Sequence, residues 1–459
     1  MKMNCRNLCN KTDEIVRLSF KKYSLFLLRL TPHQNIAQTV LSYIFLGTIV
    51  LNFPFMTNTD VSFLDNFFTA AAAVSTSGLN TVNFADSYTF LGKLVVLLLI
   101  QIGGVGYMTF SSFIFLSFSQ RHHLRLHQQE ALSADVSLPK TLAMSDFLWA
   151  AVVFTTIAEL IGATFLFHYF RAHDFTVLNA LWYSIFHSVS AFCTAGFSLW
   201  NNSLENFADS KTINIVICCL SLAGSMGFIV IADLYNFVRR KTKTISLTTK
   251  LIVSSTLILL GVGTVTLFLT SPNLTLPEAI FQSVAAMTTC GFSTVNVGLL
   301  SSASLLVLVL LMCIGGAPAG TAGGIKITAF FTVAAIMRAR LQLRSRVSLF
   351  GRRLPLIRLY AATSNFLLYT LFLLTSIFML TWTEKLPFLS LVVESAAALS
   401  TGGLSTGISG DLSALGKLII IGTMITGRIG VLTFGTAVLA SDEDDNKNLK
   451  PVTTEDVAV

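Results

Sequence analysis

The sequence predicts an all-α polytopic membrane protein with four helix–pore-loop–helix repeats, or about eight transmembrane helices, around one pore of pseudo-fourfold symmetry. Three observations favour this fold: few residues are charged, basic residues gather in every second polar gap, and a glycine-centred turn recurs four times. Of the 459 residues, 53% are hydrophobic and only 12% are charged. A soluble domain carries about 25% charged residues, so a bilayer is the expected surroundings of most of the chain.

Hydropathy predicts the spanning segments. One of them, 303–337, is too long, because a continuous helix of that length would measure about 50 Å against a hydrocarbon core of about 30 Å. We expect this segment to break within its glycine-rich centre. The predicted spans are 35–54, 90–117, 146–170, 212–237, 248–270, 303–337, 359–382 and 415–440.

Basic residues divide the polar gaps into two kinds. Most of the 31 Lys and Arg lie in the N-terminal tail and around residues 121–140, 239–250 and 338–358. Cytoplasmic loops carry an excess of Lys and Arg, so both termini are expected in the cytoplasm and the chain in the cell (inner) membrane. This pattern explains the net charge of +8 without a nucleic-acid partner.

No combination of residues predicts catalysis. The seven cysteines have no spacing typical of a zinc site or a disulfide scaffold. No carboxylate pair, Ser/His/Asp set or metal-ligand cluster is apparent in the sequence. We therefore expect no enzyme, and no cofactor or metal other than a permeant ion.

Each of the remaining gaps contains a short helix candidate followed by a turn of small residues. Four such turns in equivalent positions form an internal repeat, which is a specific signal. Packing between helices, the ordinary role of membrane glycines, suits Gly103, Gly104, Gly106, and Gly224 or Gly227 better. The turns contain Thr76, Ser77 and Gly78; Thr194, Ala195 and Gly196; Thr289, Cys290 and Gly291; and Thr401, Gly402 and Gly403.

These turns predict a cation-selectivity filter. Non-helical backbone exposes carbonyl groups, and rings of carbonyl oxygens replace the hydration shell of K⁺. Glycine permits the positive φ that such a strand needs, and the C-terminal dipole of each short helix would direct partial negative charge at the ion. We expect the twelve turn residues to bind the permeant ion.

The repeats predict a domain division. Residues 1–34 and 442–459 are expected to be cytoplasmic tails. The four repeats are expected at 35–120, 121–245, 246–345 and 346–441, and the third contains a gating loop within the membrane at 314–325.

Two further features lie on the predicted ion path. The glycine-rich loop is interpreted as a gate, although a simple kink at Pro318 is the alternative. Arg428 lies in the last span, where a charge is costly. We interpret it as a barrier to cations, with a buried ion pair to Asp233 or Glu159 as the alternative. The gating residues are Gly315, Gly316, Gly320, Gly323, Gly324, Lys326 and Arg428.

Two polar residues fall within the short helices. His187 and Glu394 are expected to anchor these helices to their neighbours by hydrogen bonds rather than to coordinate an ion.

Residues 186–197, 315–326 and 399–407 resemble the corresponding motifs of the Trk/Ktr/HKT superfamily of potassium transporters, most closely the Ktr type. The resemblance implies a filter glycine in each repeat, a gate in the third repeat and an arginine near that gate. It also implies a homodimer with one pore per protomer and a separate cytoplasmic ring of nucleotide-binding subunits, so that a nucleotide acts only through that partner. Glycine at position 78 favours potassium, since some plant relatives have a sodium-favouring serine there.

The chain departs from the family pattern at two points. The fourth filter turn has Gly402 where relatives often have a bulkier residue, and the loop reads Pro-Ala-Gly-Thr at 318–321. These departures leave open a sodium-selective or poorly selective cation transporter. A membrane enzyme or a scaffold is a third possibility, but it has no catalytic residues to support it.

Overall fold

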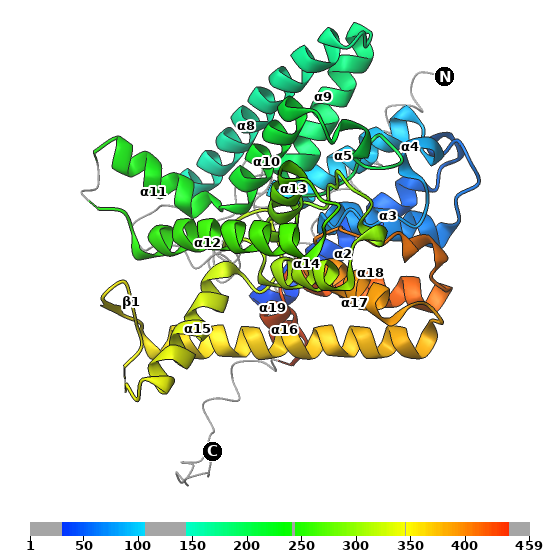
Figure 1. The fold of residues 1–459 in the computed structure, drawn as a ribbon. Helices are drawn as coiled ribbons and strands as arrows, with labels where there is room; N and C mark the ends of the chain where they lie inside the picture. Colours follow the sequence, from blue (N-terminus) through cyan, green and yellow to red (C-terminus); the bar gives the residue numbers. More distant parts are fainter. Residues whose placement is uncertain (1–29, 106–143, 241–243, 345, 440–459) are drawn as a thin grey trace, which may run out of the picture.

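The first helix of each repeat is long and apolar. The computed structural model describes residues 30–105, 144–240, 244–344 and 346–439, and its ribbon is almost wholly helical (Figure 1). Within these residues, four helices can cross a membrane by length and composition. They are α2 (Pro32–Leu51), α8 (Met144–Ala172), α12 (Leu247–Thr270) and α16 (Leu356–Thr383).

These helices differ in how much of their surface the protein covers. Only 22% of the spanning window of α8 and 17% of that of α16 is buried inside the protein, against 44% for α12. Large apolar side chains such as Ile161 and Phe378 are exposed on these helices. Since large exposed apolar surfaces mark membrane or protein contacts, this surface suits lipid tails or a second membrane protein.

The second helix of three repeats is broken. The pairs are α10 (Lys211–Ser225) with α11 (Phe228–Val238), α14 (Ser302–Ile314) with α15 (Ile327–Leu341), and α18 (Ala414–Ile429) with α19 (Val431–Leu439). In the first repeat α5 (Phe90–Val105) is continuous, and the rest of the predicted span 90–117 lies outside the described residues.

The predicted break in 303–337 is confirmed, because α14 ends at Ile314 and α15 begins at Ile327. The predicted spans at 212–237 and 415–440 are each a pair of helices. These pairs bend by 92° and 98°, at Gly227 with φ +81° and at Gly430 with φ +90°. A residue with positive φ cannot continue a right-handed helix, so Gly227 terminates a helix rather than only packing one.

A short helix follows the first helix of each repeat. These helices are α3 (Phe63–Ser75), α9 (Val177–Phe192), α13 (Leu276–Met287) and α17 (Phe388–Leu399). Ser62 caps α3 by accepting a bond from the Asp65 N–H, and Thr275 and Glu278 form a capping box on α13. Their C-terminal halves are buried and rich in alanine, as at Ala70–Ala73 and Ala396–Ala398, so that the four helix ends can approach one another closely.

The remaining described elements are short. The strands β1 (Ser348–Leu349) and β2 (Arg352–Arg353) form an antiparallel hairpin that pairs Ser348 with Arg353. The hairpin lies with the end of α15 at one end of α16, opposite α17 and α18 (Figure 1). Single-turn elements are η1 (Pro54–Met56), α4 (Phe84–Ser87), η2 (Glu205–Phe207), η3 (Val297–Leu299) and η4 (Ile408–Asp411).

Candidate ion pathway

The four predicted turns share one backbone conformation. Each begins with a threonine in the left-handed region: φ is +54° at Thr76 and +52° at Thr194, Thr289 and Thr401. Each ends with a glycine of positive φ, at +75°, +67°, +80° and +62° in chain order. The residue between them does not have positive φ. Such alternation of handedness turns successive carbonyl groups toward the same side of the strand.

Every turn is joined to its short helix by the same cap. The amide that follows the left-handed threonine donates to the carbonyl five residues earlier, and the threonine amide donates to the carbonyl three residues earlier. These two bonds form a Schellman motif, which fixes the direction of the strand relative to the helix. The longer bonds are Ser77 to Ala72 (2.8 Å), Ala195 to Ser190 (2.8 Å), Cys290 to Ala285 (2.9 Å) and Gly402 to Ala397 (2.7 Å).

The four turns close into a ring. A Cβ atom on Gly78 would collide with the Ala195 carbonyl oxygen, and one on Gly196 with that of Cys290. A Cβ atom on Gly291 would lie 3.1 Å from the Gly402 carbonyl oxygen. The order runs from repeat one to repeat four, and Gly403 completes it against the Ser77 carbonyl oxygen. The structure therefore brings together all twelve predicted turn residues.

A buried polar side chain lies nine residues before each turn glycine. His187 and Glu394 are two of them, and Gln282 and Thr69 are their equivalents in the third and first repeats; all four are at most 1% exposed. Sequence reasoning missed Gln282 and Thr69, although the constant offset from the glycine could have found them.

Three of these side chains hold the strand that follows the turn. The Gln282 amide donates to the Ser293 hydroxyl at 2.9 Å, and Glu394 accepts from the Ser405 hydroxyl. The His187 Nε2 atom lies 3.4 Å from the Ser198 hydroxyl. The expectation that His187 and Glu394 make anchoring hydrogen bonds is thus confirmed.

The bonded serines sit two residues after the glycine. In the first repeat that position is Asn80, which donates to the Gly78 carbonyl, while Thr69 accepts from the Tyr88 hydroxyl at 3.1 Å. The first repeat therefore lacks the contact between the buried side chain and the residue two positions after the glycine, which the other three repeats have.

The glycine-rich loop between α14 and α15 contacts the turns directly. The Thr321 hydroxyl donates to the Phe192 carbonyl at 3.1 Å and accepts from the Thr194 hydroxyl at 3.2 Å. The Gly323 amide donates to the Thr289 hydroxyl at 3.0 Å. Two of the four ring threonines are therefore bonded to this loop, and the loop lies against the helix-facing end of the ring.

The same loop completes the break in the second repeat. Where α10 ends, its last carbonyls have no partner within the helix. The Ala317 amide donates to the Ser225 carbonyl at 2.9 Å and the Thr321 amide to the Gly224 carbonyl at 3.0 Å. The Phe228 amide, at the start of α11, donates to the Ala319 carbonyl at 3.0 Å. The loop and the bend at Gly227 thus form one hydrogen-bonded unit.

The other predicted gating residues flank this unit. Gly315 and Gly324 have φ of +67° and +80°, and Gly316 donates to the Gly323 carbonyl. Lys326 has φ +76°, and its ammonium donates to the Ala322 carbonyl at 2.6 Å. Gly320 packs on the Ser225 carbonyl.

Arg428 joins the loop to the ring. Its guanidinium donates to the Thr76 hydroxyl at 2.9 Å, to the Thr321 carbonyl at 2.8 Å and to the Gly103 carbonyl. The alternative of an ion pair with Asp233 or Glu159 is not observed. Asp233 accepts from the Ser246 amide, and Glu159 accepts from the Gln101 amide.

An ion pair closes the ring of repeats at the other end of the short helices. The Lys417 ammonium lies 2.7 Å from the Asp65 carboxylate, and this is the one ion pair among the described residues. Asp65 is in the first turn of α3, outside the spanning helices. Burial raises its pKa, but hydrogen bonds from Lys417, Ser62 and Thr81 outweigh burial and leave the pKa below its ordinary value. Nothing in the sequence pattern pointed to this pair.

The described residues include no group of three His, Cys, Asp or Glu side chains that could hold a metal ion. The described cysteines, Cys193, Cys218, Cys219, Cys290 and Cys313, are free thiols.

Comparison with known proteins agrees with this architecture. The profile of the TrkH family, described as cation transport protein, matches residues 13–449. Ktr system potassium uptake protein B of Bacillus subtilis (strain 168) is 35% identical over 421 residues, which cover 88% of this chain and 92% of that protein. Potassium/sodium uptake protein NtpJ of Enterococcus hirae is 32% identical over 443 residues, which cover 92% and 96%.

A solved structure shares the fold. The crystal structure of the potassium transporter TrkH from Vibrio parahaemolyticus matches with a TM-score of 0.69 over 88% of this chain and 84% of that one, at 20% identity. The match of the family profile to nearly the whole chain, together with relatives above 30% identity over most of their length, shows that this multi-pass membrane protein belongs to the TrkH family of cation transport proteins.

Proposed function

We propose that this chain is the ion-conducting membrane subunit of a potassium uptake system and that K⁺ passes through the ring of four turns. The closed ring of identical backbone conformations carries the proposal. Relatives named as potassium uptake proteins support the choice of ion.

The ring supplies the chemistry that a dehydrated cation needs. The carbonyl groups of Ser77, Ala195, Cys290 and Gly402 each lie against the glycine of a neighbouring repeat, so they come from four sides of one axis. Four short helices end at the ring, and their C-terminal dipoles add partial negative charge. We infer that the twelve turn residues form the filter and that K⁺ exchanges water for backbone oxygen there.

The loop from Gly315 to Lys326 is proposed as the gate. Opening would break the bonds of Thr321 to Thr194 and to Phe192, of Gly323 to Thr289, and of Arg428 to Thr321. Neutral bonds contribute about 0.5–1.5 kcal/mol each and charged ones about 1.5–3 kcal/mol, so these three neutral bonds and one charged bond together hold the loop by about 3–7.5 kcal/mol. A shift from 1% to 99% open requires about 5.5 kcal/mol. A regulatory subunit can supply an energy of this size, and Arg428 near the path would add a charge barrier.

The assembly is proposed by similarity. Two relatives are named as parts of a Ktr system, which supports a separate cytoplasmic subunit as the carrier of any nucleotide control. The sparse burial of α8 and α16 is consistent with a homodimer in the bilayer. The basic gaps support an orientation with both termini in the cytoplasm of the inner membrane.

Poor discrimination between Na⁺ and K⁺ is the second candidate. Gly402 contributes no side chain to pack behind the fourth filter strand, and one relative is named a potassium/sodium uptake protein. A looser strand would fit Na⁺ as well as K⁺.

Growth in low potassium tests the proposal. A bacterium without its own potassium uptake should regain growth when it makes this chain with a matching regulatory subunit. Uptake of Rb⁺ in competition with Na⁺ then separates the two candidates, since equal inhibition by Na⁺ and K⁺ would favour the second. Absence of growth, with both proteins present in the membrane, would refute the uptake function.

A further inference from the structure

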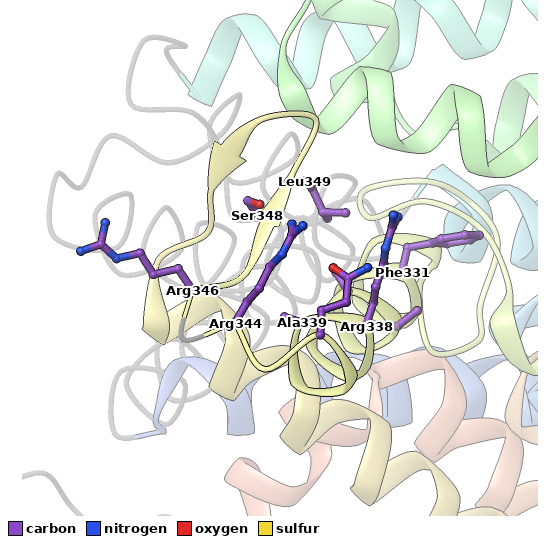
Figure 2. A pocket seen from close by; sticks show the side chains of 10 residues that line it. Phe331, Arg338, Ala339, Arg344, Arg346, Ser348 and Leu349 are labelled. Atoms are coloured by element: carbon purple, nitrogen blue, oxygen red, sulfur yellow. The ribbon is translucent and has the colours of Figure 1, made fainter.

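A cavity of about 310 Å³ lies outside the ion pathway, between the end of α15 and the β1–β2 hairpin. Its polar lining consists of Arg338, Gln342, Arg344, Arg346 and Ser348 (Figure 2). Among the described residues that line it, none carries a carboxylate. The cavity therefore presents hydrogen-bond donors and positive charge to whatever enters it.

The charge in this pocket is not neutralised within the described part of the chain. The ion pair among the described residues joins Lys417 of α18 to Asp65 of α3, and neither residue lines the pocket. Arginine is the side chain best suited to phosphate, because its planar guanidinium donates two parallel bonds to an anionic oxygen pair. Figure 2 shows the side chains of Arg338 and Arg344 directed toward Leu349, while Arg346 points away from them.

The other lining residues are apolar: Phe331, Ala334, Ala335, Ala339 and Leu349. Most of them lie on α15 together with Arg338, so charged and apolar groups are side by side in the pocket. A small soluble anion would leave the apolar groups in contact with water. A ligand with a charged head and an apolar body would cover both kinds of group.

The pocket adjoins the start of α16, a helix longer than the hydrocarbon core of a membrane. The hairpin leads directly into α16, whose 28 residues span about 42 Å. The hydrocarbon core is about 30 Å thick, so about 12 Å of α16 lies outside it. We assign this excess to the end that carries the hairpin, because basic residues favour the cytoplasmic surface of a membrane.

Apolar side chains around the pocket support this placement. Leu341, Leu343 and Phe350 are 84%, 96% and 57% exposed, and they lie between the arginines of residues 338–353. Segments at a membrane surface combine exposed Leu and Phe with Lys or Arg in this way. In water these exposed apolar side chains would be unfavourably hydrated.

We propose that this pocket binds the phosphate headgroup of an anionic phospholipid in the adjacent leaflet. Arg338 and Arg344 bind the phosphate oxygens, and Phe331 and Leu349 cover the glycerol and the first acyl carbons. None of the lining residues belongs to the proposed filter or gate, so lipid binding at this site can be tested independently of ion selectivity.

Two matched double variants of the full chain test the site. Arg338→Gln with Arg344→Gln removes two pocket charges. Arg340→Gln with Arg352→Gln removes one charge from α15, which also holds Arg338, and one from β2, at residues that do not line the pocket. The purified proteins are titrated in detergent with fluorescent phosphatidylglycerol. We expect the pocket variant to weaken the apparent Kd at least about tenfold and the control variant to change it less than about twofold.

Three results would overturn the proposal. An equal loss in the control variant would mean that general surface charge binds the lipid. Phosphatidylcholine binding as tightly as phosphatidylglycerol would mean that the pocket does not select an anionic headgroup. Glycerol 3-phosphate competing as well as the whole lipid would make this a site for soluble phosphates. If the double variant does not fold, Arg344→Gln against Arg352→Gln gives the same comparison with one charge each.

Discussion

The guanidinium of Arg428 donates a hydrogen bond to the hydroxyl of Thr76 at 2.9 Å, across 352 positions of sequence. The same guanidinium nitrogen donates to the Thr321 carbonyl in the glycine-rich loop. One side chain therefore connects the first turn of the ring with the loop of the third repeat. The sequence predicted this charge to be a barrier to cations, which stays a prediction; in the structure it bonds the loop to the ring.

Replacing Arg428 should release the proposed gate. Arg428→Gln removes charged bonds worth about 1.5–3 kcal/mol each and the positive charge near the ion path. We expect K⁺ flux without any regulatory subunit to rise by about tenfold or more, measured as Rb⁺ uptake into proteoliposomes. Lys385→Gln, at an exposed lysine, is the control for lost charge. Flux that stays at the unaltered level would show that Arg428 does not hold the gate closed.

The ring glycines should not tolerate a side chain. At Gly291 the φ is +80°, and a Cβ atom would lie 3.1 Å from the Gly402 carbonyl oxygen. Gly291→Ser should therefore abolish growth rescue or reduce the preference for K⁺ over Na⁺. Gly261→Ser, in α12 with nothing within 4 Å of the added Cβ, should leave both unchanged. Normal selectivity in Gly291→Ser would exclude this glycine from the filter.

The hydrogen bond from Ser405 to Glu394, behind the fourth turn, should contribute to both stability and selectivity. Ser405→Ala removes a hydroxyl that donates to the buried Glu394 carboxylate. Leaving a buried acceptor with fewer partners costs about 1–3 kcal/mol, so the melting temperature and the K⁺/Na⁺ flux ratio should both fall.

Ser395→Ala is the matched control for that change. Ser395 follows Glu394 on α17, and its buried hydroxyl has no hydrogen-bond partner among the described residues. Its removal should leave the melting temperature unchanged or slightly higher. Similar losses of melting temperature and flux ratio in both variants would mean that the Ser405–Glu394 bond has no special role.

The Asp65–Lys417 pair should stabilise the protein at neutral pH and lose its effect in acid. The pKa of Asp65 is lower in the folded protein than its ordinary value of 3.8. Its contribution is therefore complete above that ordinary value and is lost as the pH falls through the lower, folded pKa. Lys417→Met should lower the melting temperature by about 1–3 °C at pH 7, and the difference from the unaltered protein should shrink below pH 3.8.

Lys385→Met removes an exposed lysine of the same region and should not change the melting temperature. A difference between Lys417→Met and the unaltered protein that persists unchanged below pH 3 would contradict the assignment to Asp65.

The turns illustrate how far local pattern carries. A threonine and a glycine two residues apart, after a short apolar helix, predicted non-helical backbone in four places, and the structure has the same two positive φ values in each. Local sequence also predicted the break before Lys326, because Gly315 to Gly324 cannot form a stable helix in that length. The domain boundaries at 120/121 and 441/442 lie outside the described residues, and the division into four repeats and two tails stays a prediction.

Where local pattern failed, a distant segment had decided the conformation. Gly227 resembles a packing glycine in sequence, yet the helix bends there by 92° because the third-repeat loop satisfies the amide and carbonyl groups that the break exposes. The bend and the loop are about 90 residues apart in the chain.

The sequence by itself determined the membrane class of this chain, its four-repeat plan and the identity of the turn residues, because hydropathy and glycine conformation are properties of neighbouring residues. Only the tertiary structure decided that Gly403 closes the ring against Ser77, that Arg428 bonds Thr76 rather than a carboxylate, and that Lys417 pairs with Asp65. The physical reason is that these contacts are short-ranged, since a hydrogen bond or a close ion pair needs its atoms about 3 Å apart. Which side chains come that close depends on how the helices pack, and no local sequence pattern specifies this packing.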